Sequence, residues 1–166
     1  MNPMYALALS TGIFSGLWVW TSDSLGLLSW AGFLGCTTYF AINQEGVKGA
    51  LSCALTNISG VAWAMMIIAV SQATGHAFIG YILTAIVAFF MCIQAQQRWL
   101  SYVPGTFVGA CATFASNGDW KTVIPSLLLG LAFGIVMKEG GKKLGSSKKD
   151  SPVANQPLSN KEQTPL

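Results

Sequence analysis

Six long apolar runs constrain the fold of this chain more than any other feature, because none of them carries a charged side chain. The runs extend over about residues 4–20, 25–42, 49–71, 77–95, 99–116 and 122–137. Only 9% of the residues are charged, against about 25% in a typical soluble domain. A helix of about 20 apolar residues crosses a bilayer, and side chains that do not alternate in polarity exclude a membrane β-barrel. We therefore predict an all-α, polytopic membrane protein with six transmembrane helices.

The second half of the chain repeats the first at an offset of 74 residues. Seven of the residues between positions 35 and 60 recur unchanged at that offset: Gly35 as Gly109, Phe40 as Phe114, Ala41 as Ala115, Asn43 as Asn117, Ser52 as Ser126, Leu55 as Leu129 and Gly60 as Gly134. Glu45 and Asp119 also stay in register. Each half holds three runs, an odd number, so the second half would enter the membrane from the opposite side. The pattern predicts a 3+3 inverted repeat, an architecture that recurs in transporters and channels.

The distribution of charge predicts the domain boundaries and the orientation. We expect a membrane domain over residues 1–138, with repeat one at about 4–71 and repeat two at about 77–138. Residues 139–166, rich in Lys, Ser, Gly and Pro, predict a disordered cytoplasmic tail. Cytoplasmic N- and C-termini leave only Lys121 of the nine basic residues outside, as the positive-inside rule favours.

A few polar and aromatic side chains inside the runs are candidates for lining a path. The pore-lining candidates are Thr37, Thr38, Phe40, Asn57, Thr113 and Phe114. Hydroxyls beside a ring suit a narrow path, because they replace water while the ring restricts its width. The threonines could instead bond the carbonyl four residues earlier, and Asn57 could instead bond a neighbouring helix. We expect Gln94 and Gln96 to reach the headgroup region.

The repeated turns would form the two mouths of such a path. Asn43 and Glu45 would lie at the cytoplasmic face, and Asn117 and Asp119 at the periplasmic face. Pro104–Gly105 is a candidate helix break, which would expose backbone groups to a solute. Alternatively, Pro104 lies in the first turn of a helix, where its missing N–H costs little.

Three GxxxG motifs predict close helix packing. They are Gly12–Gly16, Gly105–Gly109 and Gly130–Gly134, and small residues at this spacing let helix backbones approach closely. The contacts could lie within one chain or between chains. A six-span protein of this size has few helices to surround a path, so we expect a homo-oligomer embedded in membrane lipid.

The sequence does not favour an enzyme. It holds one histidine, no His and Cys pairs at metal-ligand spacing, and no acid within a run to carry a coupling ion. We therefore expect no cofactor, no bound metal and no nucleic-acid partner. The leading hypothesis is a passive channel or facilitator for a small neutral or weakly charged polar solute. The alternative is a non-transporting membrane protein that acts in interaction or assembly.

Five segments of the chain carry a family resemblance. The segments GLLSWAGFLGCTTYFA, VAWAMMII, GYILTAIVAFFMCIQAQQ, VPGTFVGACATFASNGDWK and PSLLLGLAFG closely resemble the YcdZ-like family of small bacterial inner-membrane proteins. The resemblance covers about residues 5 to 138. It implies a multi-pass protein of the bacterial inner membrane. Because the family is a domain of unknown function, the resemblance supplies no substrate and no site residues.

Overall fold

The computed structural model describes residues 3–44, 46–75 and 77–146. Over these residues the chain is all-α, as predicted, with no strand. The α-helices are α1 (Pro3–Leu25), α2 (Ser29–Ala41), α3 (Gly46–Thr74), α4 (Ala77–Ile93), α5 (Val103–Ala115) and α6 (Trp120–Ser146). Two short 3₁₀ helices, η1 (Gln94–Gln96) and η2 (Arg98–Leu100), connect α4 to α5.

The six helices differ in their ability to cross a bilayer. Three segments are long and apolar enough to do so: Gly46–Thr74, Phe78–Gln96 and Trp120–Gly145. α1 is long enough but less apolar, whereas α2 and α5 have 13 residues each. At 1.5 Å per residue, 13 residues extend about 20 Å, less than the roughly 30 Å of a hydrocarbon core. α2 and α5 are therefore shorter than the full-length spans predicted for runs 25–42 and 99–116, and six crossings stay a prediction.

Turn chemistry explains why the second run gives so short a helix. Gly26 has φ +65°, a left-handed conformation that ends α1. The N–H of Leu27 donates to the carbonyl of Ser22 at 2.8 Å, which closes the last turn of α1. The apolar residues Leu25, Leu27 and Leu28 therefore belong to the end of α1 and to a turn, and α2 begins only at Ser29.

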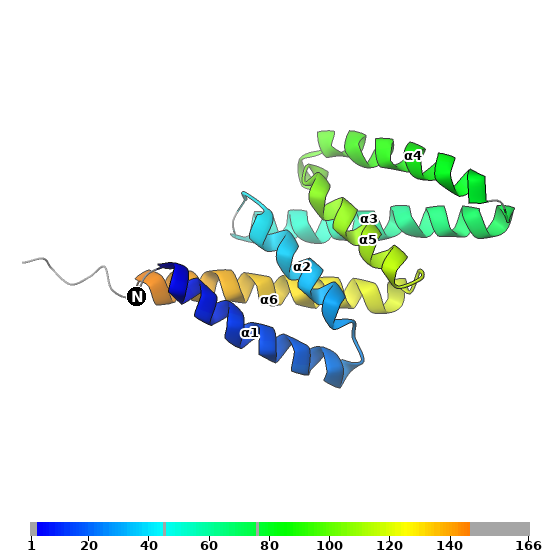
Figure 1. Ribbon diagram of the computed structural model, residues 1–166. Helices are drawn as coiled ribbons and strands as arrows, with labels where there is room; N and C mark the ends of the chain where they lie inside the picture. Colours follow the sequence, from blue (N-terminus) through cyan, green and yellow to red (C-terminus); the bar gives the residue numbers. More distant parts are fainter. Residues whose placement is uncertain (1–2, 45, 76, 147–166) are drawn as a thin grey trace, which may run out of the picture.

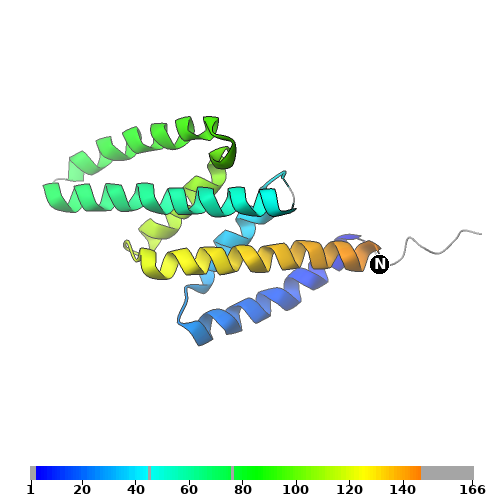
Figure 2. The ribbon, with the colours of Figure 1, turned by 180° about the vertical axis from the view of Figure 1, so that it is seen from behind.

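Successive helices run back and forth along one direction (Figures 1 and 2). α3 and α6 lie side by side in the middle and run in opposite directions, with α1 along α6 and α4 along α3. The short helices α2 and α5 lie obliquely across this pair. The start of α1 and the end of α6 share one end of the molecule, where Gly141 lies against Leu7 and Ser10 Oγ donates to the carbonyl of Met137 at 3.0 Å.

The short helix of each half packs on the long third helix of the other half. α2 packs on α6, and α5 packs on α3. At both crossings glycines bring the backbones together. A Cβ at Gly35 would overlap the backbone of Leu127, and one at Gly109 would overlap the backbone of Asn57. In space the chain therefore forms one unit of α1, α2 and α6, and another of α3, α4 and α5.

The helices begin at positions that follow the offset seen in the sequence. Three pairs of helices correspond: α1 begins at Pro3 and α4 at Ala77, α2 at Ser29 and α5 at Val103, and α3 at Gly46 and α6 at Trp120. The members of each pair are 74 residues apart. α6 does not stop at 138, where the membrane domain was predicted to end, but continues to Ser146. Its last turns pack on α1, with Gly140 against Ser10, and residues 147–166 of the predicted tail lie outside the described residues.

Candidate functional site

Asn57 lies where α2, α3 and α5 meet. Its side chain is fully buried, and its backbone lies against Gly109 of α5. Thr38 Oγ1 of α2 lies 3.4 Å from Asn57 Oδ1, but the single hydroxyl proton of Thr38 is already donated to the Leu34 carbonyl at 2.8 Å. Asn57 Nδ2 has no hydrogen-bond partner among the described residues.

The orientation of the amide does not remove this deficit. If the amide were turned by 180°, Nδ2 would donate to Thr38 Oγ1 and Oδ1 would lose its only contact. In either orientation Asn57 keeps at least one buried polar atom without a partner among the described residues. Such an atom costs about 1–3 kcal/mol unless another group satisfies it.

The predicted pore-lining threonines bond within their own helices. Thr37 Oγ1 donates to Phe33 O at 2.8 Å, and Thr113 Oγ1 donates to Gly109 O at 2.9 Å. Thr38 does the same with Leu34. Thr38 and Thr113 are buried, whereas Thr37 is exposed. The hydroxyl protons are thus used locally, although each oxygen can still accept a bond.

The two remaining pore-lining candidates, Phe40 and Phe114, are only partly buried in the protein. Phe114 is 41% exposed and Phe40 is half-buried. The structure therefore brings Thr38 and Asn57 together and leaves Thr37 and Phe114 on the outer surface. That the six residues line a pore stays a prediction.

The polar centre of the second unit is Gln94. Gln94 Oε1 accepts bonds from Ser59 Oγ at 2.8 Å and from Trp63 Nε1 at 3.0 Å. Its Nε2 donates to Thr106 Oγ1 of α5 at 3.0 Å. Gln94 therefore joins η1 to α3 and α5. The sequence had led us to expect that it would reach the headgroup region. The four-residue spacing of Ser59 and Trp63 on α3 was the only signal for this cluster.

The corresponding place in the first unit is apolar. Residues 74 positions from Thr106 and Ser59 are Gly32 and Phe133, respectively. There the ring of Trp18 lies on Gly32, with its centroid 5.4 Å from that of Phe133. In the first unit, Trp18 and Phe133 thus occupy the place that Gln94 and its partners occupy in the second.

The predicted mouth residues lie in turns. Asn43 is exposed in the bend after α2, and Glu45 lies outside the described residues. Asn117 has φ +55° between α5 and α6. Asp119 Oδ1 accepts the N–H of Thr122 at 3.4 Å, as a residue before a helix does when it caps the first turn.

Pro104–Gly105 does not break a helix. Pro104 is in the first turn of α5, where the missing N–H would have had no partner within the helix. Gly105 is buried, and a Cβ there would overlap the Thr56 side chain. Of the two readings of this pair, the structure selects the helix start.

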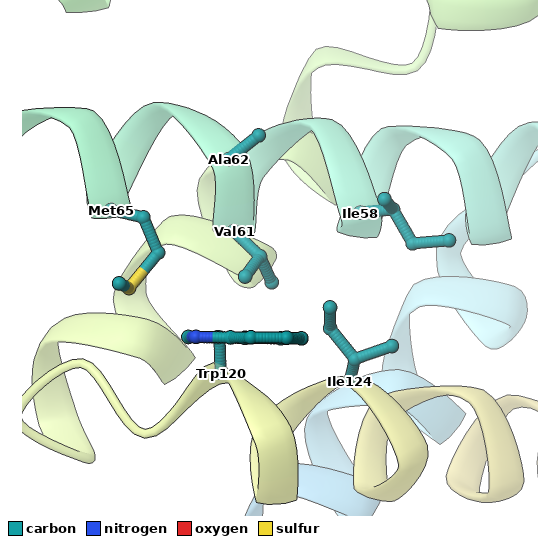
Figure 3. Close-up of a pocket in the computed structure, with 6 residues that line it drawn as sticks. All are labelled: Ile58, Val61, Ala62, Met65, Trp120 and Ile124. Atoms are coloured by element: carbon teal, nitrogen blue, oxygen red, sulfur yellow. The ribbon is translucent and has the colours of Figure 1, made fainter.

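The part of the chain that the structure describes includes two surface hollows that the pore-lining candidates do not line. The first, of ≈ 250 Å³, is apolar and lies between α3 and α6. Figure 3 shows the Trp120 ring edge-on beneath Val61 and Met65, with Ile124 beside it. The second, of ≈ 520 Å³, is the basic hollow, lined by Gln44, Lys48, Ala95, Gln96, Arg98, Trp99 and Ser101. Within the described ranges no group of three His, Cys, Asp or Glu side chains could hold a metal ion.

Comparison with known proteins supports a place in the membrane. The chain is 56% identical to inner membrane protein YcdZ of Escherichia coli strain K12, over 97% of this chain and 99% of that protein. It is 58% identical to inner membrane protein YcdZ of Salmonella typhimurium strain LT2, over 88% of this chain and 92% of the relative. An uncharacterized protein, YahC of E. coli K12, is 28% identical over 89% of this chain and 96% of its own. No solved structure matches the chain.

These relatives and the three membrane-length helices make the chain a protein of the bacterial inner membrane. The predicted resemblance and location are confirmed. The match to the family extends over residues 8–142 and includes all of α2 to α5. The chain therefore belongs to the family described as protein of unknown function (DUF1097).

Proposed function

We propose that this inner-membrane protein is a passive channel or facilitator for a small neutral or weakly charged polar solute. The observation that carries the proposal is the buried amide of Asn57, which has one polar atom without a partner at the junction of α2, α3 and α5. A passing solute or water molecule would satisfy that atom. The proposal assigns no catalytic step to any residue.

The placement of charge favours a solute without a full charge. Most of the described charged residues lie near helix ends: Asp23, Lys48, Arg98, Asp119, Lys121, Lys142 and Lys143. Lys138 and Glu139 lie about two turns before the end of α6. Ionisable groups at the middle of a span commonly mark ion pathways and proton relays. Asn57, by contrast, offers only hydrogen bonds at the centre of α3.

We propose further that the halves form a 3+3 inverted repeat. The 74-residue spacing of the helix starts supports this, as do the reciprocal packing of α2 on α6 and α5 on α3 and the alternating helix directions (Figure 1). A path between related halves would pass the short, crossing helices. At 13 residues each, α2 and α5 are the elements most suited to lie beside a narrow constriction.

The orientation follows from the same charges. Lys48, Arg98, Lys138 and the pair Lys142–Lys143 belong to the end that holds the start of α1, whereas Lys121 begins α6 at the opposite end (Figure 1). We propose that the basic end is cytoplasmic, in agreement with the positive-inside rule.

The test is solute entry into proteoliposomes, measured by stopped-flow light scattering with water, urea, glycerol and small monovalent anions. We expect one solute to equilibrate faster than in empty liposomes and Asn57→Leu to abolish that increase. Thr84→Val removes a hydroxyl from the exposed face of α4, where Oγ1 donates to the Gly80 carbonyl at 2.8 Å, and is the matched control, expected to retain transport.

The stability of Asn57→Leu separates a path from a purely structural role. Replacing an incompletely bonded buried amide with an apolar group of similar size is expected to be neutral or stabilising. If Asn57 instead held helices together, the variant would be less stable by about 0.6 kcal/mol and up to about 1.7 kcal/mol. A wild-type protein that is folded but moves no solute faster than empty liposomes would refute the proposal and leave interaction or assembly as the function.

A further inference from the structure

The basic hollow is built from two segments that are distant in sequence. Gln44 and Lys48 come from the connection between α2 and α3 and the start of α3, and the remaining residues come from Ala95 to Ser101. At ≈ 520 Å³, its volume falls within the range of small-ligand sites. It lies at the basic end of the molecule, beside the predicted headgroup region.

Hydrogen bonds to α3 and α5 fix the segment that forms one side of the hollow. Ser52 Oγ of α3 donates to the carbonyl of Trp99 at 3.3 Å, while Gln94 is held by Ser59, Trp63 and Thr106. Residues 94–101 are therefore tied to the helix core at both ends. A site on a fixed segment loses little conformational entropy when it binds a ligand.

Lys48 is positioned by the same helix. It precedes Ser52 by four residues, which places both side chains on one face of α3. Lys48 therefore lines the hollow from the face that also holds the Trp99 carbonyl. Neither Lys48 nor Arg98 forms an ion pair with a residue that the structure describes. The hollow thus presents two positive charges without a described counter-ion.

The amides of Gln44 and Gln96 also line the hollow and offer N–H groups that an anionic oxygen can accept. Ser101 Oγ donates to the carbonyl of Arg98 at 3.0 Å. A guanidinium matches phosphate geometry with two parallel N–H bonds, and an ammonium adds a point charge. Trp99 is 52% exposed, as suits an indole at headgroup level.

We propose that the basic hollow binds a phosphoryl group, carried by the headgroup of an anionic phospholipid or by a free phosphate ester, with Lys48 and Arg98 as the charged partners. Basic pockets between helices at the cytoplasmic side of membrane proteins suit such groups. The proposal is independent of solute transport and holds whether or not Asn57 lines a path.

The test is lipid binding to the full-length protein in neutral detergent, measured by native mass spectrometry. The probes are phosphatidylglycerol, with phosphatidylcholine as the zwitterionic reference. We expect tighter binding of phosphatidylglycerol and a loss of about tenfold or more in the Lys48→Gln, Arg98→Gln double variant, because each charged hydrogen bond contributes more than its neutral counterpart. Each single variant should show an intermediate loss.

The matched control is Lys121→Gln. Lys121 also lies beside a tryptophan, 6.0 Å from the ring centroid of Trp120, but at the other end of the molecule. This variant should bind phosphatidylglycerol as the wild type does. Lys48 and Arg98 are exposed, so all variants should keep the wild-type unfolding temperature.

Glycerol 3-phosphate identifies the source of the phosphoryl group. If it displaces the bound lipid in the wild type, the hollow accepts free phosphate esters. If it does not, the lipid headgroup is the ligand, and either result supports the proposal. Equal binding of the two lipids, an unchanged double variant, or an equal loss in Lys121→Gln would overturn it.

Discussion

Two glycines in GxxxG motifs allow helix packing to be tested within one protein. A Cβ at Gly109 of α5 would overlap the backbone of Asn57, whereas a Cβ at Gly12 of α1 would meet no atom within 4 Å. Both positions lie in helix interiors, Gly109 as the second glycine of its motif and Gly12 as the first glycine of its own. Gly109→Ala and Gly12→Ala therefore add the same methyl group to two different surroundings.

The magnitude follows from two opposing effects. Alanine is favoured over glycine in a helix interior by about 1 kcal/mol, and this gain applies to both variants. Overpacking costs about 1–3 kcal/mol and applies only at Gly109, where α3 and α5 would have to separate. The common gain cancels in the comparison. Gly109→Ala should thus be less stable than Gly12→Ala by about 1–3 kcal/mol.

The assay is equilibrium unfolding of both variants and the wild type in mixed micelles with increasing SDS, followed by circular dichroism. Gly12→Ala should equal or exceed the wild type. Equal stability of the two variants would refute the close approach of α3 and α5. A loss in Gly12→Ala that disappears on dilution would instead place α1 at a contact between copies, which would support the predicted homo-oligomer.

Two further substitutions test individual hydrogen bonds. Gln94→Leu should lower the free energy of unfolding by about 1–3 kcal/mol, because it leaves Ser59 and Thr106 without their partner. Amide hydrogen exchange should also accelerate in residues 94–101. Unchanged exchange there would contradict the role of Gln94 in fixing this segment. Asp119→Ala should lower the free energy of unfolding by about 0.5–2 kcal/mol, because it removes the acceptor for the Thr122 N–H. Asp119→Asn, measured by the same equilibrium unfolding in SDS, should retain most of the stability.

The sequence predicted the class of the fold and the existence of six helices because uncharged apolar runs have few other solutions in a membrane. It could not predict helix ends. Leu27 and Leu28 are as apolar as a helix interior, but the left-handed Gly26 places them in a turn. The end of α6 was missed because Gly140 weakens a helix locally. The helix nevertheless continues past Gly140, where it packs on Ser10 of α1.

The candidate site was less predictable because apolar helices carry little information about which face is buried. Thr37 and Thr38 are neighbours of the same type, yet one is exposed and the other buried. Asn57 was identified because an amide in a span needs a partner. Gln94 was assigned to the headgroups because its three partners lie 12 to 35 residues away in the chain, at positions that only the fold brings together.

The exchange of long helices between the halves has a consequence for biosynthesis. α3, α4 and α5 follow one another along the chain and complete their unit as soon as Ala115 has emerged from the ribosome. α1 and α2 are made first but find their partner α6 last. The face of α2 at Gly35, which lies on the backbone of Leu127, must therefore stay open while about 85 further residues are inserted, those between Ala41 and Leu127. A nascent chain arrested before Trp120 should hold a protease-resistant middle and an accessible beginning.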